Sequence, residues 1–338
     1  MAAPWYGVVL AAGKGTRMKS DQAKVLHEVF FAPMVHHVLE ALQPLALSGT
    51  FVVAGHQREA VEAALAPYAP VFVYQETQGG TGHAVLMTEA VLAGKPGTAL
   101  ILCGDTPLIR SETLQGMMLA HEAGGSPLTI MTTVLEEPTN YGRIVTDKVG
   151  RVVAIVEEKD ATPEQRQLTE INAGIYCVDI AFLFEALKQI GTTNVQGEMY
   201  LTDIVALANH GGQRVNRYVC ADCLEVLGVN SRVELAQAHT FLQARRNAGL
   251  MLAGVTLIHP ETIAISHSVR IGRDTVIQPN VTISGETEIG QECRIDASVI
   301  IRNCRIGDGT VIGPLSVLED VSVGPSERIA PLTLLRGA

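Results

Sequence analysis

The chain has 338 residues with a formal net charge of −10 at pH 7, and 47% of its residues are hydrophobic. This length exceeds the usual size of one hydrophobic core, so two domains are expected, and the composition excludes a disordered chain. The negative charge disfavours a basic face for nucleic acid, so a bound phosphate must be held by a local site. No apolar run is long enough to span a membrane and no basic region precedes the first apolar segment, which predicts a cytoplasmic protein without membrane insertion.

Up to about residue 220, apolar segments alternate with amphipathic helical patterns such as 33–45 and 82–92. The segments 6–11, 50–55, 71–75 and 99–105 are rich in aliphatic residues and predict buried strands of a parallel sheet. This alternation predicts a Rossmann-like, doubly wound α/β domain, which we assign to 1–229. Loops at the carboxyl ends of such strands form the usual ligand crevice, so 13–24, 75–81 and 104–105 should converge there.

The first predicted strand runs into a loop with two glycines, Gly13 and Gly15, and four cations, Lys14, Arg17, Lys19 and Lys24. The glycines let backbone N–H groups approach phosphate oxygens, and fixed cations beside such a turn are costly unless an anion pairs with them. The loop fits no Walker A register, and Met18 stands where a dinucleotide-binding motif requires its third glycine. The loop therefore predicts a phosphate site of another kind.

Asp105 directly follows the apolar segment that begins at residue 99. A carboxylate at the end of a strand in the predicted crevice is well placed to hold Mg²⁺, although Asp105 could also be a helix N-cap ahead of Pro107. Asn230 could equally be a turn residue ahead of Ser231. The residues alone leave both alternatives open.

A helix is predicted over the linker 230–250, with Ser231 as N-cap and Glu234 at the capping-box position. The remaining segment, 251–338, has an aliphatic residue at every sixth position from Ile265, with the spacing shortened by one residue after Ile301 and after Leu318. Such a period fits neither a helix nor simple strand alternation. It predicts a parallel β-helix of about four coils, each with three hexapeptide faces.

Eight motifs now favour a family. They are LAAGKGTRMKSDQAKVLHEV, QGGTGHA, LCGDTPLI, YGRIV, IVEEKDAT, EINAGIY, QGEMYLTD and GVNSR, followed by the hexapeptide repeats. In this order they closely resemble bacterial N-acetylglucosamine-1-phosphate uridylyltransferase over essentially the whole chain. The resemblance implies a left-handed β-helix, UTP and N-acetylglucosamine 1-phosphate as substrates, Mg²⁺ as the cofactor, and a homotrimer formed through the β-helix.

The resemblance also implies roles for individual residues. Arg17 and Lys24 would be catalytic, and Asp105 and Asn230 would ligate Mg²⁺. The nucleotide would be bound by Leu10, Ala11, Ala12, Gly13, Gly15, Gln75, Gly80 and Thr81. The sugar phosphate would be bound by Gly142, Glu157, Asn172 and Tyr200.

Two substitutions and the length of the repeat region depart from the family pattern. Ala23 replaces the usual proline before Lys24, which should loosen the backbone that aims this lysine, and Ala173 replaces a threonine near the sugar. Full-length family members continue for many more coils, in which almost all acetyltransferase residues lie. The resemblance therefore implies a truncated β-helix without acetyltransferase activity.

Three other interpretations stay open at this point. The chain could act on another sugar 1-phosphate or another nucleotide, or it could be a non-catalytic scaffold of the same fold. A scaffold is free to lose Arg17, Lys24 or Asp105, and all three are present, which favours an enzyme. A dinucleotide-binding oxidoreductase is disfavoured by Met18. His36, His37, His56 and His83 show no metal-ligand spacing and are interpreted as packing or surface groups, with His83 adjoining the predicted base-reading turn.

Overall fold

The computed structural model describes residues 3–337. The chain divides into two compact units. Unit 1 contains the chain up to His27 and Pro33–Arg232, and unit 2 contains Glu28–Ala32 and the chain from Val233 onward.

Unit 1 is built on a nine-stranded sheet with the order β11-β7-β10-β6-β1-β4-β5, to which the β8–β9 hairpin is added through β10. The four strands predicted from the sequence are confirmed as parallel neighbours: β1 (Trp5–Ala11), β4 (Gly49–Ala54), β5 (Val71–Tyr74) and β6 (Thr98–Cys103). The sheet as a whole is mixed, because β10 is antiparallel to both β6 and β7. The other strands are β7 (Leu128–Val134), β8 (Arg143–Thr146), β9 (Val152–Val156), β10 (Glu170–Asp179) and β11 (Val215–Val219).

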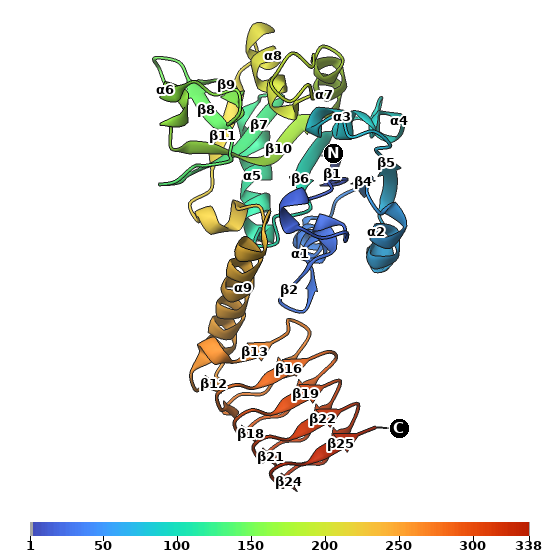
Figure 1. Ribbon diagram of the computed structural model, residues 1–338, viewed down its shortest axis with the longest axis vertical. Coiled ribbons are helices and arrows are strands. Elements are labelled where there is room, and N and C mark those ends of the chain that lie inside the picture. Colours follow the sequence, from blue (N-terminus) through green and yellow to red (C-terminus); the bar gives the residue numbers. More distant parts are fainter. Residues whose placement is uncertain (1–2, 338) are drawn as a thin grey trace. The chain divides into compact units, whose positions relative to one another are not determined.

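Helices cover both faces of this sheet, as the doubly wound prediction requires (Figure 1). One face packs against α1 (Met34–Leu42), α2 (Arg58–Leu65) and α5 (Ser111–Gly124). The other packs against α3 (Thr81–Leu86), α4 (Glu89–Leu92), α7 (Ile180–Leu187) and α8 (Ile204–His210). Successive residues of β1 alternate between the two cores, since Val8 belongs to one and Val9 to the other.

The single helical pattern expected over 82–92 is divided into α3 and α4. Thr88 is completely buried and its hydroxyl donates to the Val85 carbonyl at 2.7 Å, which draws the chain into a turn between the two helices. Shorter elements of unit 1 are the helix α6 (Pro163–Arg166) and the 3-10 turns η1 (Thr16–Met18), η2 (Lys24–Leu26), η3 (Gln43–Leu45), η4 (Ala66–Tyr68), η5 (Leu201–Asp203) and η6 (Cys223–Val226).

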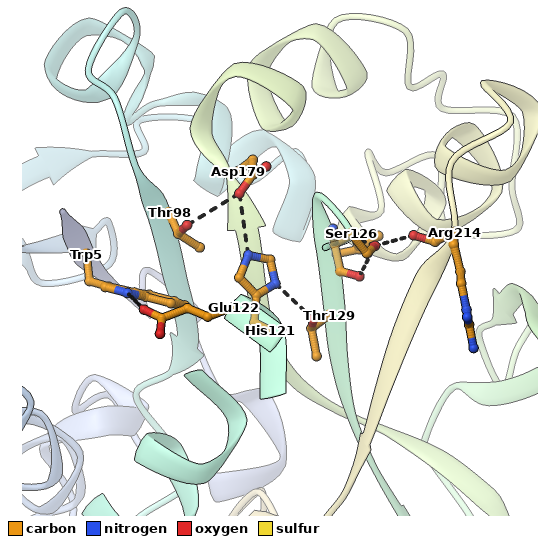
Figure 2. Close-up of polar contacts among 9 residues, drawn as sticks. Trp5, Thr98, His121, Glu122, Ser126, Thr129, Asp179 and Arg214 are labelled. Atoms are coloured by element: carbon orange, nitrogen blue, oxygen red, sulfur yellow. Dashed lines mark hydrogen bonds and ion pairs between the residues drawn. The ribbon is translucent and has the colours of Figure 1, made fainter. Parts of the chain in front are cut away.

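A partly buried polar network ties α5 to the sheet at the amino ends of β6 and β7 (Figure 2). The His121 ring, 5% exposed, bonds to Thr129 at 2.8 Å and lies 3.4 Å from Asp179, which accepts from Thr98 at 3.3 Å. This edge of the sheet is opposite the carboxyl ends of the parallel strands, so the network stabilises the fold away from the predicted crevice.

Unit 2 is a parallel β-helix preceded by α9 (Arg232–Leu252), with the turn η7 (Pro260–Thr262) between its first strands. One sheet consists of β12 (Thr256–Leu257), β15 (Val276–Ile277), β18 (Arg294–Ile295), β21 (Val311–Ile312) and β24 (Arg328–Ile329). A second consists of β13 (Ala264–Ile265), β16 (Thr282–Ser284), β19 (Ile300–Arg302), β22 (Val317–Glu319) and β25 (Leu334–Arg336). The third consists of β14 (Arg270–Ile271), β17 (Glu288–Ile289), β20 (Arg305–Ile306) and β23 (Ser322–Val323).

The hexapeptide prediction is confirmed position by position. Ile265, Ile283, Ile301, Leu318 and Leu335 are paired in register through successive strands of one sheet. Stacked identical faces of this kind are consistent with the predicted left-handed β-helix. The Asn247 side chain, 1% exposed, caps the start of the coil by donating to the carbonyls of Pro260 and Ile263 at 2.7 and 2.9 Å.

The short segment Glu28–Ala32 packs with unit 2 although it interrupts unit 1 in sequence. Phe30, 1% exposed, makes edge-to-face contacts with His239 of α9 and with His267, and its N–H lies 3.3 Å from the His239 ring. None of the helices in residues 3–337 combines the length and apolar character that crossing a membrane requires.

Four histidines whose pKa is lowered in the folded chain predict a loss of stability in mild acid. Burial lowers the pKa of His121, against the opposing effect of Asp179, and also lowers the pKa of His27, His36 and His239. Below the ordinary pKa of 6.5 the unfolded chain therefore binds protons that the folded chain does not, so the free energy of unfolding falls as pH drops from about 7 toward 5.

Denaturant unfolding across this pH range should show the decline. His121→Gln keeps a donor and an acceptor without titrating, and should reduce the slope by up to one proton, about 1.4 kcal/mol per pH unit. An unchanged slope in this variant would show that His121 takes no part in the pH dependence.

Candidate active site

A cation and two oxygen ligands converge at the carboxyl ends of β1 and β6. The Lys24 ammonium pairs with a carboxylate oxygen of Asp105 and lies 2.6 Å from Oδ1 of Asn230. The Lys24 side chain is 12% exposed and that of Asp105 is 20% exposed, so the pair is largely withdrawn from water. Residues far apart in sequence therefore share one small polar site.

Backbone contacts hold the members of this cluster in place. The Gly104 N–H donates to the Leu10 carbonyl at 2.9 Å, which fixes the chain just before Asp105. The Val229 N–H donates to the carbonyl of Asp105 itself at 2.8 Å, which brings Asn230 to the same strand end. Helix α5 begins only at Ser111, so Asp105 is not the N-cap that the sequence left open as an alternative.

A cavity of about 260 Å³ opens beside Lys24 and Asp105. Among the residues assigned to the nucleotide, it is lined by Leu10, Ala12, Gly13, Gln75, Gly80 and Thr81. Gly15 packs closely against the Lys24 side chain. Its φ is +63°, and a Cβ there would lie 2.6 Å from the Lys24 Cβ. The three segments expected to converge therefore do so.

Arg17, expected to be catalytic, and Ala11, expected to bind the nucleotide, lie elsewhere. Arg17 is exposed in η1, does not line this cavity, and makes no ion pair within the described residues 3–337. Ala11 is 1% exposed and its side chain belongs to the core that packs against α1. Ala11 thus contributes backbone and packing, and Arg17 is not part of the Lys24 cluster in this structure.

The turn predicted to read the base, residues 75–81, packs against the QGEMYLTD segment, which is distant in sequence. Gln75, 5% exposed, has its amide nitrogen 3.1 Å from the Gly80 carbonyl and 2.9 Å from the His83 ring. Gly80 has φ +99°, and a Cβ there would lie 2.6 Å from the Met199 carbonyl. The glycine is therefore required by the close approach of the QGGTGHA and QGEMYLTD segments.

A second cavity, of about 350 Å³, is lined by two of the residues assigned to the sugar phosphate, Glu157 and Tyr200. The other two, Gly142 and Asn172, do not line it. The β8–β10 pairing places Asn172 beside Gly142, and the β8–β9 pairing places Gly142 beside Glu157. The Asn172 N–H donates to the Gly142 carbonyl at 2.9 Å, and a Cβ on Gly142 would lie 3.5 Å from a Glu157 oxygen. All four therefore belong to one region of unit 1.

Acidic groups dominate this second region. Burial raises the pKa of Glu157, a hydrogen bond from Thr202 opposes the shift, and the neighbouring carboxylates of Asp160, Asp203 and Glu198 add to it. The Tyr200 hydroxyl lies 3.2 Å from Asp160. The arrangement offers several hydrogen-bond acceptors, which suits the hydroxyl groups of a sugar.

Sequence reasoning missed several residues of these sites. Gln78, Cys103 and Glu198 also line the Lys24 cavity, and the Gln78 amide donates to the Ala12 carbonyl at 2.8 Å. Burial raises the pKa of the Cys103 thiol to about 12, so it stays protonated. Gln78 is the first residue of QGGTGHA and Glu198 is the third residue of QGEMYLTD, so membership in a recognised motif was the available signal.

Arg143 was also missed. It is 2% exposed and pairs with Glu158 at 2.7 Å, which joins β8 to the residue after Glu157. A buried guanidinium needs such a partner.

Comparison with known proteins identifies the family of this chain. Residues 7–169 match the MobA-like NTP transferase domain and residues 259–337 match the GMPPB C-terminal domain. The chain is 48% identical over 322 residues to the bifunctional protein GlmU of Desulfotalea psychrophila, covering 95% of each protein. It is 51% identical to that of Geobacter metallireducens, covering 62% of it, and 45% identical to that of Pelobacter propionicus, covering 73%.

The chain belongs to the GlmU family. A solved structure titled a putative glucose-1-phosphate thymidylyltransferase from Bacillus anthracis aligns with a TM-score of 0.56 at 18% identity, over 70% of this chain and 94% of that one, and supports the fold. The predicted family, the nucleotidyltransferase enzyme class and uridylyl transfer to N-acetylglucosamine 1-phosphate are confirmed at the level of the GlmU family.

GlmU-type nucleotidyltransferases use a divalent metal, and the Lys24 cluster fits one. A carboxylate of Asp105 and the amide oxygen of Asn230 already converge on a positive charge, and both are hard oxygen donors. No group of three or more His, Cys, Asp or Glu side chains in residues 3–337 forms a complete metal cage. Two protein oxygens supplemented by substrate phosphates and water are the arrangement typical of Mg²⁺.

The packing of Gly15 against Lys24 leads to a prediction. In Gly15→Ala, left-handed backbone strain is added and the new methyl group displaces the Lys24 side chain, so nucleotidyl transfer should slow by at least about 10-fold. Gly125→Ala is the matched control, because Gly125 has φ +58° and a Cβ there would have nothing within 4 Å. Steady-state kinetics and thermal unfolding of both variants test this: equal losses of activity would show that contact with Lys24 is irrelevant.

Proposed function

We propose that this chain transfers the uridylyl group of UTP to N-acetylglucosamine 1-phosphate and releases pyrophosphate, with Mg²⁺ held by Asp105 and Asn230. The proposal is carried by the convergence of Lys24 with these two oxygen ligands, beside a cavity lined by the glycine loop and the Gln75 turn. Membership in the GlmU family supports the choice of substrates.

The chemistry is governed by charge. A phosphate oxygen of the sugar 1-phosphate attacks the α-phosphorus of UTP, and pyrophosphate leaves from the opposite side. The attacking oxygen is already deprotonated, so no general base is required, but two anions must be brought together. When bound, Mg²⁺ supplies charge neutralisation to the phosphate oxygens.

Each part of the chain has a defined task in this reaction. Lys24 neutralises charge that develops on the phosphates, and the backbone at Gly13 and Gly15 lets the triphosphate approach closely. Gln75 and the Gly80–Thr81 turn bind the uracil. Glu157 and Tyr200, with Gly142 and Asn172 beside them, bind the sugar. Arg17, exposed at the edge of the loop, contributes a further cation toward the triphosphate.

The second activity in the name of the relatives concerns the C-terminal domain. That domain is present here as the β-helix of unit 2, so the fold itself gives no support to the expectation that acetyltransferase activity is absent. This expectation stays a prediction. Assembly as a homotrimer through the β-helix and a cytoplasmic location also stay predictions.

Removing the charge of Lys24 should abolish most of the activity. In Lys24→Met the phosphates lose a preorganised cation, and kcat should fall by about 10²- to 10³-fold.

In Asp105→Asn the metal site loses its charged ligand. The Mn²⁺ affinity, measured by isothermal titration calorimetry in the presence of UTP, should therefore fall together with kcat. Formation of UDP-N-acetylglucosamine is followed by chromatography.

Wild-type protein is the reference, with UTP, dTTP and ATP supplied in competition. Equal product from the wild type and Lys24→Met would remove the proposed mechanism. A preference for dTTP or ATP would show that the chain is a nucleotidyltransferase with a different nucleotide substrate.

The sugar side should respond differently from the nucleotide side. Glu157→Gln removes the acceptor charge at the sugar cavity, so the KM for N-acetylglucosamine 1-phosphate should rise by about 10-fold or more, while the KM for UTP changes little. Initial-rate kinetics with each substrate varied in turn measure both constants. A rise in the KM for UTP alone would place Glu157 on the nucleotide instead.

A further inference from the structure

The segment that follows β4 holds the loop that carries Lys24. The Gln57 side chain accepts from the Ala23 N–H at 2.8 Å through Oε1, and donates to the Asp21 carbonyl at 2.6 Å through Nε2. The His56 ring lies 3.2 Å from the same Asp21 carbonyl. The consecutive side chains of His56 and Gln57 therefore hold the segment just before Lys24. Of these two, it is Gln57 that contacts both Asp21 and Ala23.

The contact with Ala23 satisfies a buried donor. Ala23 is 1% exposed, and its N–H has no acceptor in residues 3–337 apart from Gln57. A backbone N–H withdrawn from water destabilises the local structure unless it is paired. Without Gln57 the loop must open to water or shift, and either movement displaces the next residue, Lys24.

The backbone at position 23 explains why this donor exists. Ala23 has φ −52° and ψ 132°, close to the φ that a proline ring enforces. A proline here would hold the angle by itself and would have no N–H to satisfy. Alanine leaves the angle free and adds a donor, so the position needs an acceptor from elsewhere. The expected loosening of the Lys24 loop is thus opposed by Gln57.

We propose that Gln57 is a positioning residue for Lys24, made necessary by the alanine at position 23. Ala23 is the N-cap of η2, the turn that begins with Lys24, so the bond from Gln57 fixes the origin of the lysine side chain. The proposal rests on the proposed function, because its kinetic consequence is expressed through Lys24. Small displacements of such a group lower the rate strongly.

A double-mutant cycle tests the dependence on position 23. Gln57→Ala should lower kcat for UDP-N-acetylglucosamine formation by about 10-fold in the native background. In a chain that carries Ala23→Pro, the same substitution should change kcat by less than about 2-fold, because proline has no N–H to leave unpaired. The KM for N-acetylglucosamine 1-phosphate should stay unchanged throughout.

Two further variants sharpen the assignment. Gln57→Glu keeps an acceptor for the Ala23 N–H but loses the donor to Asp21, so it should retain more activity than Gln57→Ala. Arg58→Ala is the matched control, because Arg58 is the next residue, is exposed, and contacts Glu76 at 3.3 Å and the Tyr74 ring, neither of which belongs to the loop. Hydrogen exchange of the peptide 20–27 should accelerate in Gln57→Ala and not in Arg58→Ala.

The outcomes separate this proposal from the proposed function. An equal loss of kcat in both backgrounds, or unchanged hydrogen exchange of 20–27 in Gln57→Ala, overturns the role of Gln57. If Ala23→Pro does not fold, the Gln57→Glu variant and the exchange measurement still decide. A wild-type chain that makes no product but shows faster exchange in Gln57→Ala would refute the substrate assignment and leave the loop contact intact.

Discussion

The pairing of Lys24 with Asp105 and Asn230 is the constraint on which the candidate site depends. A lysine side chain that is 12% exposed must have a charged partner, since taking an unpaired ammonium out of water is costly. The partners come from positions 81 and 206 residues away. One buried cation therefore fixes the glycine loop, the end of β6 and the Gly228–Asn230 segment relative to one another.

The mixed sheet divides the chemistry of unit 1 between two kinds of strand. The segments proposed to bind the nucleotide follow the carboxyl ends of the parallel strands β1, β5 and β6, where successive loops meet at one edge. The region proposed to bind the sugar is built around the antiparallel pairs β8–β9 and β8–β10, which bring Gly142, Glu157 and Asn172 together. Strand β10 pairs with β6 on one side and with β8 beyond it, so both groups of strands belong to one sheet.

Features with a regular period could be predicted from the sequence, and long-range polar contacts could not. The strand at 6–11 and the hexapeptide series from Ile265 follow geometric repeats, which survive in the sequence whatever the chain packs against. Asn230 could not be separated from an ordinary turn residue, because its role depends on the distant Asp105 carbonyl that accepts from Val229. The Arg143–Glu158 pair and the Gln57 contact have no periodic signal either.

The two units differ in how their residues depend on one another. In the β-helix each coil pairs only with its neighbours, so a change at Ile301 affects the coils that hold Ile283 and Leu318 and the number of coils is not fixed by any one of them. In unit 1 a change at Ala23 alters its contact with Gln57 and the position of the next residue, Lys24. Through Lys24 it also affects Asp105 and Asn230. Substitutions at the site should therefore be tolerated in compensating pairs, whereas those in the coil should act locally.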